Sequence, residues 1–185
     1  PGDALILIGE TKGHLGASLY AREILGLDGD DAGTPPPVDL DVEKKNAAFV
    51  RKLVTKGLVN AAHDVSDGGI ACAVTEMALA SGVGVALVVD DCLVDLEAPY
   101  PELEIFAEDG AQILLSVSSE HVSEIQSHLT DNSVRNTLCG GIKRDGDCIE
   151  FWDDDSETAE ILFKVSLSTL REAHEGWLPL YMDGE

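Results

Sequence analysis

The stretch HDVSDGGI, which spans His63–Ile70, lies between a strand-like run and a helix-like run. It brings a histidine, two carboxylates, a hydroxyl and two glycines to the point where α/β folds place phosphate sites. Asp64 would end the strand and Gly69 would open the helix, so side-chain oxygens and helix N–H groups would converge. The stretch therefore predicts an α/β fold with a metal and phosphate site at this junction.

Strands and helices alternate on both sides of this stretch. Hydrophobic periodicity predicts strands at 58–62, 83–89, 112–117 and 134–138, with helices at 69–80 and 122–129 between them. The order βαβ followed by βαβ is the split βαβ pattern of ferredoxin-like sheets. We therefore expect an α/β (α+β) fold with a mixed sheet and helices packed on one face.

The remaining segments extend this scaffold. We expect a strand at Ala4–Ile8, helices at about 42–56 and 168–175, a hairpin over 142–151 turning at Asp145-Gly146, and a helix capped by Ser156. Residues 28–40 combine proline, glycine and aspartate and are expected to form an exposed connection. Because a strand begins almost directly after Pro1, we expect residues 1–185 to be one domain of a longer chain.

The charge of the chain excludes several classes of partner. Twelve basic against 35 acidic residues give a formal net charge of -23, which repels nucleic acid and anionic membranes. A bound phosphate would then need backbone N–H groups, a divalent metal or another domain; solubility, or adaptation to a saline environment, is the alternative reading of the charge. The four cysteines form no C-x-x-C pair, and no apolar run is long enough to span a membrane, so a cytoplasmic location is expected.

Two carboxylates of the opening stretch are candidate metal ligands. Asp64 and Asp67 suit Mg²⁺, which uses one or two carboxylates together with phosphate oxygens and water. Gly68 and Gly69 allow a phosphate to approach the helix N-terminus. The structural alternative is that Ser66 or Asp67 caps the helix and Asp64 is a turn residue. His63 is only a secondary candidate, and no residue is assigned a catalytic role.

Several segments together resemble a known family. They are Leu5–Thr11, His63–Gly69 with Glu76-Met77-Ala78, Ile105–Glu108, Cys139–Ile142 and the ending 170–182. With these motifs the chain resembles the last domain of the phosphoribosylformylglycinamidine synthases. That domain belongs to the aminoimidazole ribonucleotide synthetase-like C-terminal class. The resemblance covers nearly the whole chain.

The resemblance implies a part in an ATP-dependent ligase of purine biosynthesis. Such enzymes use ATP, Mg²⁺ and glutamine-derived ammonia to convert a formamide into an amidine. Their partners are the upstream domains of the same chain, a glutamine amidotransferase subunit and a small accessory subunit. By the D-x-S-D-G motif of related thiamine monophosphate kinases, Asp64 and Asp67 would bind the metal, and Ser66 with Gly68 and Gly69 the nucleotide.

The segment after Ile105 departs from the family pattern. Glu108 matches an acidic segment that serves the active centre, but Ala107 replaces a glycine and Gln112 stands at the position of an arginine. Losing that arginine removes a clamp for phosphate or carboxylate groups. We therefore expect a scaffold with either an auxiliary or structural nucleotide site or an empty one, and no catalysis by this chain alone. A related small-molecule kinase and a non-catalytic packing or homodimer module are the alternatives.

Overall fold

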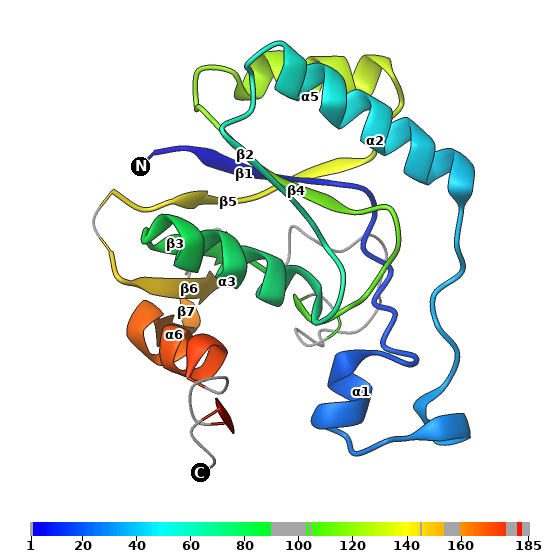
Figure 1. Cartoon of the computed structure of the whole chain (residues 1–185). Helices are drawn as coiled ribbons and strands as arrows, with labels where there is room; N and C mark the ends of the chain where they lie inside the picture. The colour runs from blue at the N-terminus through cyan, green and yellow to red at the C-terminus, as the bar shows by residue number, and fades with distance from the viewer. Residues whose placement is uncertain are drawn as a thin grey trace.

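The computed structural model describes residues 2–89, 103, 105–144, 146–153, 160–176 and 181–182. A seven-stranded sheet with the order β2-β4-β1-β5-β3-β6-β7 forms its centre (Figure 1). The strands are β1 (Ala4–Ile8), β2 (Ala61–Asp64), β3 (Val85–Val88), β4 (Ile113–Val117), β5 (Asn136–Ile142), β6 (Cys148–Trp152) and β7 (Ile161–Ser166). The helices are α1 (Leu19–Glu23), a 3-10 turn η1 (Gly29–Ala32), α2 (Leu40–Thr55), α3 (Gly69–Ser81), α5 (Val122–Asp131) and α6 (Leu167–Glu175).

Strand β1 is the centre of the hydrophobic core. It pairs antiparallel with β4 on one side and with β5 on the other. Its alternating side chains enter two separate clusters: Leu5 and Leu7 pack with α3 and α6, whereas Ile6 and Ile8 pack with α2 and α5. All four side chains are at most 1% exposed. A strand that is apolar on both faces requires cover on both faces.

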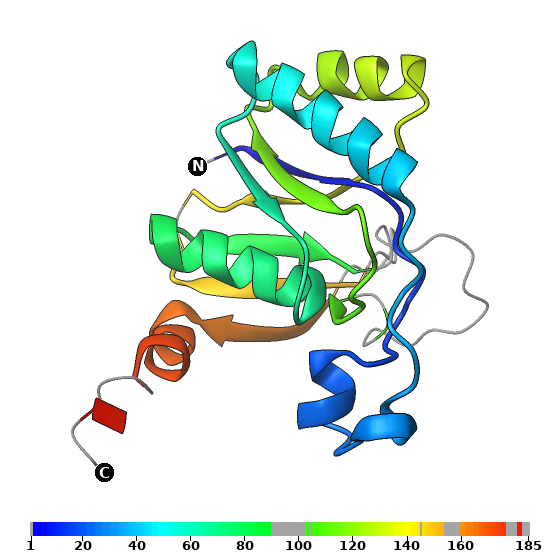
Figure 2. The same ribbon diagram turned by 45° about the vertical axis from the view of Figure 1, so that its right-hand side comes forward.

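The expectation that helices pack on one face is therefore wrong. Helices α2 and α5 cover one face of the sheet, and α3 and α6 lie on the other, as the two views in Figures 1 and 2 show. The physical reason is the unbroken apolar run of β1, since burying only one face would leave Ile6 and Ile8 in water.

The split βαβ pattern is present twice. The antiparallel pairings make β2 parallel to β3 with three strands between them, and make β4 parallel to β5 with β1 between them. Helix α3 connects the first parallel pair and α5 the second. The order differs from that of a four-stranded ferredoxin-like sheet, because β1 lies between β4 and β5 and β2 stands at the edge of the sheet.

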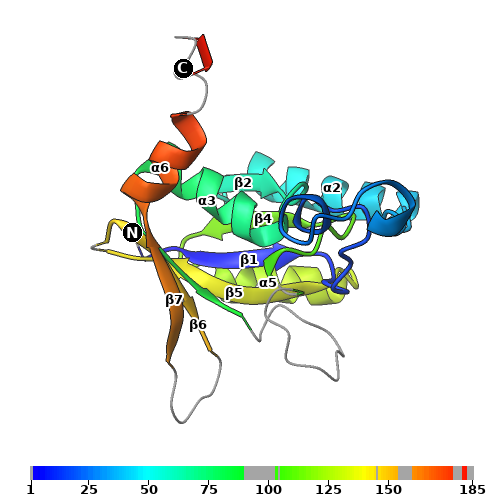
Figure 3. The same cartoon turned by 90° about the horizontal axis from the view of Figure 1, so that it is seen from below.

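The C-terminal third corrects two expectations. The hairpin predicted over 142–151 is wrong, because β6 pairs in parallel with β3 and not with β5; its turn residue Asp145 lies outside the described residues. Strand β7, which sequence reasoning missed, pairs antiparallel with β6, and the ring of Phe163 stacks on Phe151 with centroids 4.2 Å apart. Seen from below, β6 and β7 continue the sheet beyond β5 (Figure 3). Ser156, the expected helix cap, also lies outside the described residues.

Two boundaries bear on the site. Strand β2 spans 61–64 instead of 58–62, because Leu58 and Val59 pack against the α2 side of the core and pairing with β4 begins at Ala61. The expected connection at 28–40 is largely exposed and contains η1. Within the described part of the chain, no helix is long and apolar enough to cross a membrane.

Candidate functional site

The stretch His63–Gly69 joins β2 to α3, as its composition predicts. Asp64 is the last residue of β2, and Gly69 is the first residue of α3. Val65 is buried between them, and its N–H donates to the carbonyl of Gln112 at 3.1 Å. The buried valine holds the loop to the sheet while the polar residues on either side remain at the surface.

Two consecutive left-handed glycines form the helix start. Gly68 has φ +76° and Gly69 has φ +64°, a conformation that side-chain-bearing residues rarely adopt. A Cβ on Gly69 would lie 2.7 Å from the carbonyl oxygens of both Ile105 and Ala107. Gly69 is therefore required by a close approach of the 105–107 backbone to the first turn of α3, whereas a Cβ on Gly68 would lie 2.3 Å from Sγ of Cys72.

Glu108 ties this helix start to another helix start. One carboxylate oxygen, Oε1, accepts hydrogen bonds from the backbone N–H groups of Gly68 and Leu19, each at 2.7 Å. Leu19 is the first residue of α1. A negatively charged hydrogen-bond acceptor is favoured at both helix N-termini, because their first N–H groups have no partner within the helix and the helix dipoles are positive there. Glu108, a secondary candidate from sequence, is thus placed as a residue that positions the glycine loop.

The backbone donors of the two glycines are engaged within the protein. The N–H of Gly68 meets Glu108, and the N–H of Gly69 donates to the carbonyl of Ser66 at 3.0 Å. This pattern changes what the loop can offer to a phosphate: further contacts would have to come from the Ser66 hydroxyl, from later N–H groups of the first turn, or from a metal.

The exposed oxygens of the loop suit a hard cation. Asp64, Ser66 and Asp67 are all exposed, and the Asp64 side chain is 80% exposed. Among the described residues, no group of three or more His, Cys, Asp or Glu side chains gathers as a complete metal site. Two carboxylates without a third fit Mg²⁺, which commonly completes its shell with phosphate oxygens and water. Residues Asp64 and Asp67 would supply the protein ligands.

His63 has structural contacts. Its Nδ1 lies 2.6 Å from the carbonyl oxygen of Asp64, and its Nε2 lies 3.1 Å from Oε2 of Glu76 on α3. The ring therefore links the end of β2 to the middle of α3. It also borders a cavity of about 990 Å³ between α3, α6 and the sheet.

Burial, together with nearby acidic residues, suppresses the ionisation of Cys72. Its thiol lies on the first turn of α3, and burial raises its pKa above the ordinary value, with further raising from Glu76, Glu108 and Asp67. A raised pKa leaves less thiolate, which is the nucleophilic form. We therefore expect the Cys72 thiol to be a weak nucleophile. On the outer side of the loop, Asp67 adds to the effect of the bonded Glu23 in raising the pKa of Arg22.

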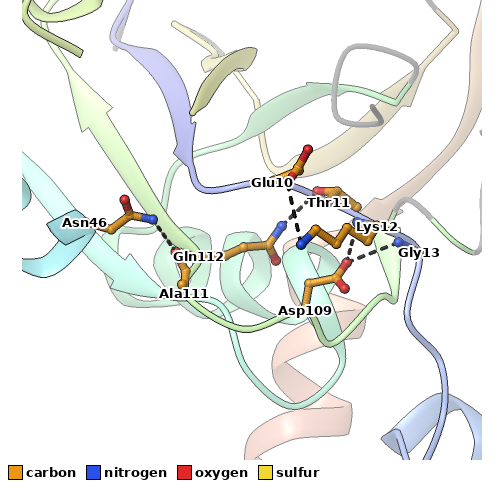
Figure 4. A network of polar contacts seen from close by, with 8 residues as sticks. All are labelled: Glu10, Thr11, Lys12, Gly13, Asn46, Asp109, Ala111 and Gln112. Carbon is orange, nitrogen blue, oxygen red and sulfur yellow. Dashed lines mark hydrogen bonds and ion pairs between the residues drawn. The ribbon is translucent and has the colours of Figure 1, made fainter. Parts of the chain in front are cut away.

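A second carboxylate, next to Glu108, also binds two backbone N–H groups, which sequence reasoning missed. We call Glu108 and Asp109 the two carboxylate clamps. Asp109 is buried, and its Oδ2 accepts from the backbone N–H groups of Lys12 at 2.7 Å and Gly13 at 3.1 Å (Figure 4). Gln112, at the position of the family arginine, is also buried and donates from Nε2 to Oγ1 of Thr11 at 2.8 Å. The only signal in the sequence was the adjacent pair Glu108-Asp109, which identifies neither target.

Comparison with known proteins identifies the relatives of this chain. The family model described as AIR synthase related protein, C-terminal domain, matches residues 1–135. The chain is 36% identical over its full length to phosphoribosylformylglycinamidine synthase subunit PurL of Bartonella tribocorum, and 39% identical over 98% of its length to that of Caulobacter vibrioides. It spans 22% of the length of each of these relatives.

Solved structures show the same fold. T. maritima PurL complexed with FGAR superimposes with a TM-score of 0.77 at 18% identity, over 92% of this chain and 28% of that one. The same protein complexed with ATP gives 0.72 at 16% identity, over 92% of this chain and 26% of that one. With the family model matching nearly three quarters of its residues, the chain belongs to the AIR synthase related protein C-terminal domain family.

Proposed function

We propose that this chain is the C-terminal domain of a phosphoribosylformylglycinamidine synthase, an ATP-dependent ligase of purine biosynthesis. The support is the 36–39% identity to PurL subunits over nearly the whole chain. Because the chain spans 22% of those relatives, the remaining domains would lie in the same polypeptide. The glutamine amidotransferase and small accessory subunits, and the cytoplasmic location, stay predictions.

Within that enzyme, we propose that the loop at 64–69 provides half of an auxiliary Mg²⁺–nucleotide site. The observation that carries this is the pairing of exposed Asp64 and Asp67 with the start of α3, in a loop that Glu108 holds in place. A bound Mg²⁺ would neutralise phosphate charge beside a chain of net charge -23. The protein's own part is to hold two carboxylates and the Ser66 hydroxyl at a fixed helix start.

Titration of the intact polypeptide with ATP tests the site, with Mg²⁺ and then with EDTA. Asp64→Asn and Asp67→Asn should each weaken Mg²⁺-dependent binding by about tenfold or more, because each removes one charged ligand from a site that has two. Asp131→Asn, an exposed aspartate at the end of α5, is the matched control.

Equal binding by the Asp64, Asp67 and Asp131 variants would reject the metal assignment and favour a packing role for the loop. Transfer of the ATP γ-phosphate to thiamine monophosphate by the intact polypeptide would instead favour the kinase alternative. The proposed ligase predicts consumption of ATP that depends on a formamide substrate and on ammonia.

A further inference from the structure

Three basic side chains from three separate segments border one small cavity on the α2 side of the sheet. Lys12 follows β1, Lys45 lies in α2, and Arg135 precedes β5. They are three of the twelve basic residues in a chain of net charge -23. The cavity has a volume of about 170 Å³, and Pro36 and Pro37 form part of its wall.

The carboxylates beside this cavity are already engaged. Asp109 receives the N–H groups of Lys12 and Gly13. Asp39 is the N-cap of α2, and its Oδ1 receives the N–H groups of residues 41 and 42, each at 3.1 Å. Charge-assisted bonds to backbone donors stabilise these carboxylates without using the basic side chains. Glu10 differs from these two carboxylates because it contacts a basic side chain: its Oε2 lies 3.6 Å from Nζ of Lys12.

The basic groups have donors to spare. Nζ of Lys45 makes one hydrogen bond, to the neutral carbonyl of Ser133 at 2.6 Å. Among the residues that the structure describes, Nζ of Lys12 has only the 3.6 Å contact with Glu10, and the side chain is 65% exposed. The guanidinium of Arg135 has no hydrogen bond or ion pair with any residue that the structure describes. An arginine offers a planar fork of donors that matches phosphate and carboxylate groups.

The backbone around the cavity is held in conformations that need outside support. Gly9, Ala111 and Ser133 all border it and have φ values of +106°, +63° and +53°. Ala111 is fixed from both sides. Its carbonyl accepts from Asn46 at 2.8 Å (Figure 4), and its N–H donates to Oε1 of Glu43 at 3.0 Å. Left-handed backbone at non-glycine positions is concentrated at ligand-binding sites, where surrounding contacts hold it.

We propose that this cavity binds inorganic phosphate or a small phosphate monoester, with Arg135 and Lys45 as the main ligands and Lys12 at the rim. The site is separate from the loop at 64–69. It differs in chemistry, because the protein's own cations would contact the anion directly and no metal ion is required. In a strongly acidic chain, such local cations are what allows an anion to bind without a metal.

Calorimetric titration of the intact polypeptide in EDTA tests the proposal, with inorganic phosphate and ribose 5-phosphate as the two probes. The double variant Arg135→Gln/Lys45→Gln should lose at least about tenfold in affinity, and Lys12→Gln should lose less, because its side chain is largely exposed. Tighter binding of ribose 5-phosphate than of phosphate would identify a monoester site; the reverse would identify a free-phosphate site.

The matched control is Arg51→Gln/Lys52→Gln, which removes the same two charges from an exposed part of α2. It should leave the affinity unchanged. Asp64→Asn should also leave it unchanged, which separates this site from the proposed nucleotide site. The proposal is overturned if neither probe binds the unmodified protein, or if the two double variants bind alike while both retain the thermal transition of the parent.

Discussion

The loop at 64–69 and the basic cavity lie at opposite ends of one short segment, 105–112, and they differ in how they could hold an anion. At the loop, exposed carboxylates lie beside a helix start where Glu108 accepts the N–H of the N-cap residue Gly68. At the cavity, Asp109 takes backbone N–H groups while basic side chains stay available. The adjacent carboxylates Glu108 and Asp109 therefore position two proposed sites of opposite charge character. The difference teaches that the net charge of a chain does not determine the local chemistry of its sites.

The largest expected effect is a loss of stability at the loop of residues 64–69. Gly69→Ala should destabilise the protein by roughly 2–4 kcal/mol, because a Cβ would meet backbone atoms of 105–107 and the left-handed conformation would be strained. Urea unfolding measures the loss. Gly82→Ala is the matched control: its φ is +67°, but a Cβ there meets nothing within 4 Å, so only strain of about 1 kcal/mol is expected. Equal losses would show that the close approach contributes nothing.

A smaller effect is expected from substituting either carboxylate clamp, Glu108 or Asp109, and it should differ between the two proposed sites. Glu108→Gln should cost about 1 kcal/mol, because its two backbone hydrogen bonds lose charge assistance on a half-buried side chain. It should weaken Mg²⁺-dependent ATP binding and spare phosphate binding in EDTA. Asp109→Asn should do the reverse, since it loosens the backbone at Lys12 and Gly13. If both variants weakened both ligands equally, segment 105–112 would act as one unit and the two sites would not be independent.

The smallest effect concerns the reactivity of Cys72. Its raised pKa means that, at a pH below that pKa, less thiolate is present than in a free cysteine, so alkylation by iodoacetamide should be slow and should speed up as pH rises. Glu108→Gln removes one of the charges that raise this pKa, so the midpoint of the pH–rate profile should move down. The expected change in rate is less than about tenfold.

Mass spectrometry of the Cys72 peptide measures the alkylation rate, and Glu124→Gln on α5 serves as the control. A rise in rate at every pH, with no movement of the midpoint, would indicate loosening of the loop instead of an electrostatic effect.

Much of the fold could be predicted because its signals are local. The apolar run Ala4–Ile8 and the helix over 69–80 follow from patterns within a few residues, and their observed bounds differ by one residue at most. The pairing of β6 with β3 could not be predicted, because strand order depends on contacts between residues far apart in the chain. Strand β7 was missed for the same reason: it is defined by its pairing with β6, where Phe163 stacks on Phe151.

The candidate site divides in the same way. Local sequence decided that Asp64 ends a strand, that a helix starts at Gly69, and that two glycines stand where side chains would be strained, since each depends on backbone preferences of adjacent residues. Only the tertiary structure decided which carboxylate holds that helix start, and that three distant basic residues meet at one cavity. Those arrangements depend on which strands lie side by side, and such pairings join residues that are far apart in the chain.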